Sequence, residues 1–460
     1  MTEDFIEPTK YPVKDLVGNT PLSRDSAVAY DSVKRDALAK IDNEELKFIH
    51  FRICMVAGVG FLTSAYHLFS INLVSAIFGH AYFTDNANVV PISIDTELKS
   101  SATFGAILGL LLFGWMSDRY GRKKMYGFEL VIIIVAAVGS ALSANSFAVN
   151  MFSEIMFWRI LLGMGVGGDY ILSAVITSEF ATKRRRGMTI PESPRFIMDV
   201  KGDIKKGYVE VEDLLRYDSY KSNKQSETHC LVEPPKTTLK DFREYFGRWK
   251  NGKILLATSF TWFAIDVGFY GIAFNQGIIL NAINLNNASD PYQSLYDVAV
   301  GNIVVTALGT VPGYWCSILL IDKLGRKFIQ QMGFAVLTVL FLILGISFHM
   351  DIPPIIFTII FTISMFFINF GPNTTTFVVP AEVFPTRYRC TGYGISAASG
   401  KLGAIVAQMC ILFLKDIGGK NHFISCLFQI FAAFAFAGFL CSYLIPETKD
   451  RSLEETSNEV

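Results

Sequence analysis

The chain has 460 residues, of which 51% are hydrophobic and only 18% charged, and its formal net charge is zero. Its mean hydropathy is +0.37, whereas soluble domains usually carry about 25% charged residues. This composition excludes an ordinary soluble globular protein, and the neutral balance gives no support to a nucleic-acid partner. The seven cysteines are scattered and form no CxxC pair, so we predict neither a disulfide framework nor a metal site.

Ten apolar stretches follow a polar first segment of about fifty residues that does not resemble a cleavable signal peptide. Since about 20 apolar residues cross a hydrocarbon core of about 30 Å as a helix, each stretch is long enough to span a bilayer. Runs such as Val131–Val138 lack the alternation of a barrel strand. We therefore predict an all-α polytopic membrane protein embedded in the lipid bilayer. The predicted spans are 52–78, 100–117, 125–144, 152–178, 254–282, 299–321, 328–349, 354–378, 393–414 and 422–445.

Basic residues are concentrated in alternate loops. Arg122–Lys124 follow the second span and Lys183–Arg186 the fourth, whereas the loops at 81–97, 144–150 and 284–297 contain no lysine or arginine. Because basic loops stay in the cytoplasm, we predict that both termini are cytoplasmic. The predicted regions are an N-terminal tail (1–51), a first half-bundle (52–183), a cytoplasmic linker (184–253), a second half-bundle (254–446) and a C-terminal tail (447–460).

The segment Trp115–Lys124 is echoed by Leu320–Lys327, and each copy follows the second span of a block of apolar helices. In both copies glycine allows a tight turn, and aspartate can face the positive end of a neighbouring helix. Two copies at equivalent positions indicate an internal repeat with a gating motif in each half. The residues predicted to form these motifs are Asp118, Arg119, Gly121 and Arg122, and Asp322, Gly325 and Arg326.

The repeat continues, but its first copy is shorter. Glu382 and Pro446 are separated by 64 residues that contain the last two spans, whereas the equivalent Glu179 and Pro191 are separated by 12 residues that contain none. These signatures resemble the sugar-porter-like branch of the major facilitator superfamily, in which each half has six helices. The resemblance implies the major facilitator fold with two helical half-bundles and about ten spans instead of twelve, without helices five and six. An exon-skipped isoform, a gene-model error and a degenerate copy are alternative origins.

Within this superfamily, three segments resemble the phosphate:proton symporters of fungi and plants: Gly167–Ala174, Asn369–Phe377 and Gly394–Ala404. The resemblance implies that inorganic phosphate and protons are the partners, that the chain acts in the plasma membrane by alternating access, and that it is neither an enzyme nor dependent on a cofactor. The first helix departs from the family pattern Thr-Asp-Ala-Tyr-Asp, since Thr63–His67 contains neither acid.

The predicted substrate site is centred on the seventh family helix, where Trp262, Asp266 and Tyr270 share one face at spacings of four residues. A carboxylate inside a span is costly and usually faces a cavity, a partner or an ion path. The resemblance implies that this triad binds phosphate while Asp266 carries a proton; a structural aspartate paired across the bundle is the alternative. Further donors are expected at Tyr170, Asn369 and Asn373, without a dense cage of lysine and arginine. Asn373 has the alternative role of capping a broken helix.

Three charged residues lie inside the first half-bundle: Glu129, Arg159 and Asp169. The resemblance implies a proton path through them in which Arg159 holds a carboxylate, and a structural ion pair is the alternative. The family's fifth helix brings a glutamine to the phosphate, and this chain has no such helix. A non-transporting phosphate sensor and an inactive truncated isoform are therefore alternative functions. A sugar or polyol porter is a further alternative, because the repeated signatures are shared with that branch, and the oligomeric state is not predicted.

Overall fold

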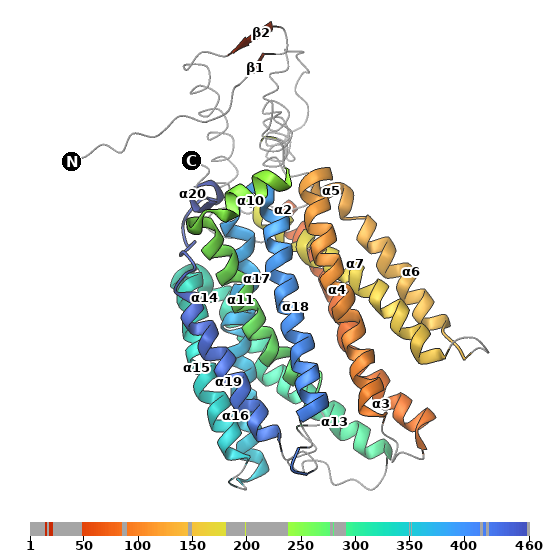
Figure 1. Cartoon of the computed structure of the whole chain (residues 1–460). Helices are drawn as coiled ribbons and strands as arrows, with labels where there is room; N and C mark the ends of the chain where they lie inside the picture. Colours follow the sequence, from red (N-terminus) through yellow and green to blue (C-terminus); the bar gives the residue numbers. More distant parts are fainter. Residues whose placement is uncertain are drawn as a thin grey trace.

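The computed structural model is a bundle of long helices that run side by side (Figure 1). Within the part of the chain that the structure describes, ten helical segments are long and apolar enough to cross a membrane. The structure describes residues 14–15, 18–21, 48–84, 90–145, 150–180, 198, 238–276, 279, 291–348, 350, 352–414, 417–419 and 423–457. Pro191, which ends the shortened part of the repeat, and most of the predicted linker (184–253) lie outside the described residues.

Four spans form the first half-bundle. The first is divided between two consecutive helices, and the third begins with a single short turn of helix. In chain order the elements are α2 (Phe48–Phe69), α3 (Ile71–Tyr82), α4 (Ile92–Tyr120), α5 (Arg122–Met125), α6 (Phe128–Leu142) and α7 (Met151–Phe180).

Six spans form the second half-bundle, between two short helices at its ends. The elements are α10 (Leu239–Gly247), α11 (Trp249–Ala273), α13 (Pro291–Val305), η2 (Thr306–Thr310), α14 (Val311–Leu324), α15 (Arg326–Ser347), α16 (Pro354–Asn369), α17 (Pro372–Val383), η3 (Thr386–Tyr388), α18 (Arg389–Leu414), α19 (Ile424–Ser442) and α20 (Leu453–Ser457). One short antiparallel pair, β1 (Lys14–Asp15) and β2 (Gly18–Pro21), departs from the all-α prediction within the N-terminal tail.

The ten predicted spans are all confirmed, and the two largest shifts of their boundaries are at the start of the second span and the end of the fifth. α4 begins at Ile92 instead of residue 100. The Lys99 ammonium pairs with the Asp95 carboxylate at 2.7 Å, and this pairing reduces the cost of placing both charges on a helix near the membrane. α11 ends at Ala273 instead of residue 282. There the Asn275 side chain donates to the Gly271 carbonyl oxygen at 3.1 Å, a local bond that competes with continued helix.

The two halves meet along α4 and α18, which pack extensively against each other. One hydrophobic core passes through this contact, since Leu110 and Phe113 of α4 belong to the same buried cluster as Tyr393 of α18 and Trp262 of α11. The halves therefore share a continuous interior at mid-bundle.

The second half-bundle is better enclosed than the first. α19 packs against both α11 and α15, whereas α6 packs mainly against α7 and lies at the edge of the bundle in Figure 1. Val131, Ile134 and Val138 of α6 are exposed apolar side chains. Such a surface is stable in lipid, where exposed apolar groups carry no penalty. The exposed face is consistent with the predicted loss of two helices from the first half.

Candidate functional site

The predicted triad lies on one buried face of α11. Trp262, Asp266 and Tyr270 are each at most 3% exposed, and their spacing of four residues places them in a row along the helix. Asp266 lies in the interior of the bundle, where an unpaired carboxylate would be strongly destabilising.

The partner of Asp266 is Lys401 of α18. The Lys401 Nζ lies 3.3 Å from the Asp266 Oδ2 and 2.7 Å from the Tyr270 hydroxyl, and it is buried. The same ammonium lies over the rings of Tyr270, at 4.4 Å, and of Tyr170, at 4.9 Å. These contacts assemble one cation, one carboxylate and two tyrosines from both halves.

Lys401 was missed by the sequence analysis, which expected neutral donors only. The available signal was a lysine near the middle of the predicted span 393–414, because a charge at that depth is costly enough to indicate a function or a partner. The preceding residue, Gly400, allows the close approach of α18 to α11. A Cβ atom at Gly400 would lie 2.4 Å from the Trp262 Cδ1 and 2.9 Å from the Asp266 Oδ2.

The predicted asparagines lie at the break between α16 and α17. The Asn373 Nδ2 donates to the Tyr314 hydroxyl and to the Asn369 Oδ1, each at 2.8 Å. The Asn369 Nδ2 donates to the Met365 carbonyl oxygen at 2.7 Å. Asn373 therefore does not cap α17, whose N-cap residue is Gly371. The asparagines instead connect the predicted site to Tyr314 of α14, which the sequence analysis did not name.

The first span covers this cluster with aromatic side chains. The Phe61 ring lies 4.8 Å from the ring of Tyr170, and the Phe69 ring stacks on Tyr270 with centroids 6.1 Å apart. Beyond Phe69, the Asn72 Nδ2 donates to the Ala273 carbonyl oxygen at 3.2 Å, which connects α3 to the end of α11. These contacts join the halves on one side of the Asp266–Lys401 pair.

The predicted charged group of the first half is only partly assembled. Asp169 accepts hydrogen bonds from Ser64 at 2.8 Å and Ser173 at 2.9 Å. Glu129 is buried, and neither of its carboxylate oxygens has a hydrogen-bond partner within the described residues. The prediction that Arg159 holds a carboxylate is wrong for this structure. Its Nε instead donates to the Leu98 carbonyl oxygen of α4 at 3.0 Å, and among the described residues no ion pair joins it to Glu129 or Asp169.

The first gating motif joins the two halves. Gly121 and Gly325 have φ values of +104° and +93°, so both copies of the motif use glycine for a left-handed turn. We call the end of the bundle that contains these two turns the gate end. Here Asp118 accepts hydrogen bonds from the Cys390 backbone N–H at 3.2 Å and the Thr391 backbone N–H at 2.7 Å, at the start of α18. A carboxylate at a helix N-terminus is stabilised by the helix dipole.

A second set of contacts closes the gate end beside Asp118. The Glu179 Oε1 lies 3.1 Å from both the Arg122 Nη2 of its own half and the Arg389 Nη1 of the second half. Arg122 also donates to the Thr386 carbonyl oxygen at 2.7 Å. Arg119, the remaining member of the motif, lies over the ring of Trp115 at 5.5 Å.

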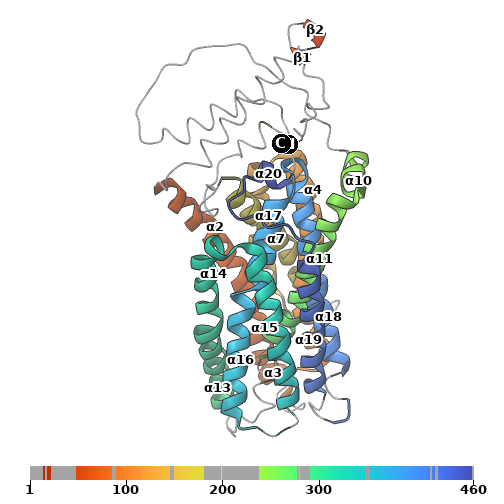
Figure 2. The same cartoon turned by 90° about the vertical axis from the view of Figure 1, so that its left-hand side faces the viewer.

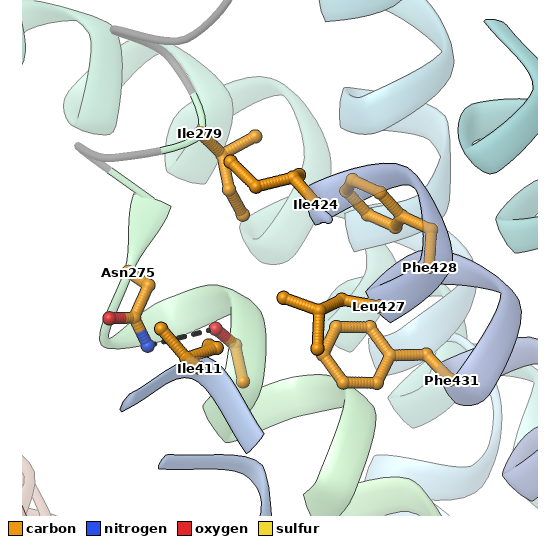
Figure 3. Close-up of a pocket in the computed structure, with 8 residues that line it drawn as sticks. Asn275, Ile279, Ile411, Ile424, Leu427, Phe428 and Phe431 are labelled. Atoms are coloured by element: carbon orange, nitrogen blue, oxygen red, sulfur yellow. Dashed lines mark hydrogen bonds between the residues drawn. The ribbon is translucent and has the colours of Figure 1, made fainter. Parts of the chain in front are cut away.

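A separate small pocket lies within the second half-bundle (Figure 3). Apart from Asn275, its lining side chains are apolar, and Asn275 itself is bonded to Gly271 and Gln408. With no charged side chain in its lining, this pocket does not match an anion. The lining residues are Gly271, Asn275, Ile279, Ile411, Ile424, Leu427, Phe428 and Phe431.

Comparison with known structures identifies the fold. The chain resembles the major facilitator superfamily proton:xylose symporter XylE with a TM-score of 0.65 and 18% sequence identity, over 88% of this chain and 98% of the other. An inward-open structure of XylE from E. coli matches with a TM-score of 0.57. The architecture is therefore the major facilitator fold, with ten candidate spans.

Family comparison locates the shortened region. The family described as "Sugar (and other) transporter" matches residues 53–191 and 187–460 as two segments. These segments meet in the interval where the sequence repeat predicts that two helices are missing. The break between the two matches supports the predicted absence of two helices there. Together the matches cover residues 53–460.

Curated relatives narrow the family further. The chain is 34% identical to the repressible high-affinity phosphate permease of Neurospora crassa, over 93% of this chain and 89% of the relative. It is 36% identical to the inorganic phosphate transporter PHO84 of Saccharomyces cerevisiae, over 92% and 86%. The first alignment extends over 517 positions, more than the 460 residues of this chain. The chain therefore belongs to the sugar (and other) transporter family of the major facilitator superfamily, as a ten-span relative of the fungal phosphate permeases.

Proposed function

We propose that this chain is a multi-pass transporter of inorganic phosphate, driven by protons and working by alternating access between its half-bundles. The observation that carries the proposal is the buried cluster of Lys401, Asp266 and Tyr270 in the second half, which meets Tyr170 of the first half. Phosphate transport by the curated relatives supports the same substrate. Tyr170, Trp262, Asn369 and Asn373 complete the proposed binding set.

The ion pair supplies a route to proton coupling. As long as Asp266 is ionised, it pairs with Lys401 at 3.3 Å and would repel a phosphate anion. When Asp266 takes up a proton, the Lys401 ammonium is released to pair with phosphate, and the carboxyl becomes a hydrogen-bond donor. Loss of that proton restores the Asp266–Lys401 pair and displaces the anion. Proton and phosphate thus bind together, because the proton binds Asp266 and so releases Lys401 to bind the phosphate.

The first half-bundle supplies the proposed proton path through Asp169 and Glu129. Ser64 occupies the place of the first acid in the family's Thr-Asp-Ala-Tyr-Asp pattern, and its hydroxyl donates to Asp169. We propose that this hydroxyl replaces the missing acid as the relay to Asp169. The basic loops favour a cytoplasmic gate end and cytoplasmic termini in the plasma membrane, so the closed Asp118 and Glu179 contacts would separate the site from the cytoplasm.

The test is uptake of radiolabelled phosphate at acidic and alkaline external pH, in cells without their own phosphate importers. We expect uptake that increases with the proton gradient and is inhibited by phosphate but not by glucose or inositol. Asp266→Asn should abolish the proton-driven component, a loss of at least about tenfold. Glu154→Gln is a matched control, since it neutralises a half-buried carboxylate at the start of α7, away from the proposed site. Proton-driven uptake by Asp266→Asn at normal surface expression would disprove the proposed coupling.

A non-transporting phosphate sensor is the second candidate, and the ten-span architecture favours it. The described residues contain ten candidate spans, and the loss of two helices from the first half would reduce its contact with the second. Phosphate binding to the purified protein without net uptake would identify a sensor. Loss of both binding and uptake would indicate an inactive chain.

A further inference from the structure

Two groups of aromatic rings lie on either side of the Asp266–Lys401 pair. We call them the inner ring group, towards the gate end, and the outer ring group, towards the opposite end. The Lys401 ammonium lies over one ring of each group, at 4.9 Å from Tyr170 of the inner group and 4.4 Å from Tyr270 of the outer group. The inner group consists of Phe61, Tyr170, Trp262, Phe377 and Tyr393, and the outer group of Phe69, Phe269, Tyr270 and Phe274.

The direction of the helices places each group on its side of the pair. In Figure 2, α10 and α20 lie at the gate end of the bundle, as they do in Figure 1, and α11 follows α10. Trp262 of the inner group precedes Asp266 by about one turn of α11, whereas Tyr270 of the outer group follows it by about one turn. α18 also begins at the gate end, and Tyr393 precedes Lys401 by about 12 Å along this helix.

A single side chain carries the contact between the halves in the inner ring group. Among the described residues, each ring contact of this group between the half-bundles involves Phe377 of α17. Its ring centroid lies 5.6 Å from those of Phe61 and Tyr170 in the first half. It lies 6.4 Å from Trp262 and 6.0 Å from Tyr393 in the second half. Since edge-to-face ring pairs are favourable and close-packed, the Phe377 ring closes the inner group where the halves meet.

The outer ring group depends on one side chain in the same way. Phe69, the last residue of α2, is its one ring from the first half. The Phe69 ring lies 6.3 Å from Phe269, 6.1 Å from Tyr270 and 5.7 Å from Phe274, all of the second half. Each group is thus closed by one phenylalanine, which comes from the second half on the inner side and from the first half on the outer side.

We propose that Phe377 and Phe69 are two gates that control access to the Asp266–Lys401 pair from opposite ends of the bundle. Movement of either ring separates the halves on its own side, while the other group stays closed. A constriction of rings suits an ionic cargo, because an apolar layer is a barrier to ions until it opens. The inference rests on the proposed function for the identity of this cargo. The Asp118 and Glu179 contacts are a separate barrier, nearer the gate end than Phe377.

The test measures access to a thiol placed between the two gates. Lys401→Cys supplies the thiol, in a chain in which serine replaces the seven natural cysteines. Asp266→Asn accompanies it, so that no unpaired carboxylate is left buried. The probe is a membrane-impermeant methanethiosulfonate reagent, applied to vesicles of either orientation. Because the gate-end contacts also block the inner route, access from that end is measured with Glu179→Gln present.

We expect Phe377→Ala to accelerate labelling from the gate end, and Phe69→Ala from the opposite end, each by at least about tenfold and from that end alone. The matched control is Phe366→Ala, which should change neither rate. Phe366 is half-buried like the two gates, but its ring contacts are with Phe367 and Phe370 of its own segment. Phe377→Leu and Phe69→Leu are measured in parallel; they keep most of the packed volume and so report on the gates where an alanine variant does not fold.

Rates equal to those of the Phe366→Ala control would overturn the inference, as would acceleration from both ends by one variant. Phosphate binding and uptake are measured separately, in the chain that retains Lys401 and Asp266. Labelling from one end in each variant, together with no phosphate binding or uptake, would support the gates and refute the proposed function. Normal proton-driven uptake together with unselective labelling would have the opposite meaning.

Discussion

The two gating motifs form equivalent ion pairs but differ in what lies against their aspartates. In the first half, Arg122 pairs with Asp118 at 3.3 Å and Glu179 at 3.1 Å; in the second, Arg326 pairs with Asp322 at 2.8 Å and Glu382 at 3.3 Å. The Asp118 side chain is only 5% exposed, whereas that of Asp322 is 34% exposed. The difference arises because Asp118 lies against the start of α18. Asp322 instead pairs with Arg326 of its own half.

The second motif stabilises its own half instead. The Glu447 carboxylate accepts hydrogen bonds from the backbone N–H groups of Arg326 at 3.0 Å and Lys327 at 3.1 Å, at the start of α15. Thr448 donates to Glu382 within the same network. The motif by itself therefore forms a local turn and an ion pair. It joins the halves only where a helix of the other half, such as α18, begins beside its aspartate.

The largest effect on the gate is expected from Glu179→Gln. This change removes the common partner of Arg122 and Arg389 and leaves both cations buried, which costs about 3–5 kcal/mol in comparable buried pairs. The gate end should open, and a maleimide should label buried Cys390 at least about a hundredfold faster. The measurement uses a variant in which serine replaces the other six cysteines. An unchanged labelling rate would mean that Glu179 does not hold the halves together.

An intermediate effect is expected from Asp118→Asn. The amide keeps an oxygen for the N–H groups of Cys390 and Thr391 but loses the charge that favours the start of α18. Since hydrogen bonds to charged groups contribute about 1.5–3 kcal/mol, labelling of Cys390 should accelerate by about tenfold or more. A rate equal to that of the parent chain would show that charge at Asp118 is unimportant to closure.

The smallest effect is expected from Asp322→Asn, the matched change in the second motif. Asp322 is partly exposed and pairs within its own half, and exposed ion pairs contribute about 0–1 kcal/mol. Labelling of Cys390 should change by less than about fivefold. An effect as large as that of Asp118→Asn would contradict the proposed asymmetry and imply that the second motif also joins the halves.

Much of the architecture follows from the sequence. Each predicted span is confirmed because hydrophobic length is a local property of about 20 residues, and the paired glycines at residues 121 and 325 adopt the predicted turns. The short first repeat also predicts the absence of two spans. The face of α11 that bears Asp266 follows from its helical spacing alone, so the sequence places this carboxylate correctly inside the bundle.

Only the tertiary structure decides which distant residues meet. Lys401 reaches Asp266 from a helix 135 residues further along the chain, and its own sequence position does not reveal that partner. Arg159 lacks the predicted carboxylate, since α7 directs it towards the Leu98 carbonyl of α4. The ring contacts of Phe69 and Phe377 between the halves likewise depend on which helices meet around Lys401. The sequence thus determined the number, order and inward faces of the spans, whereas helix packing determined the ion pairs, because a pair requires two side chains to meet in space.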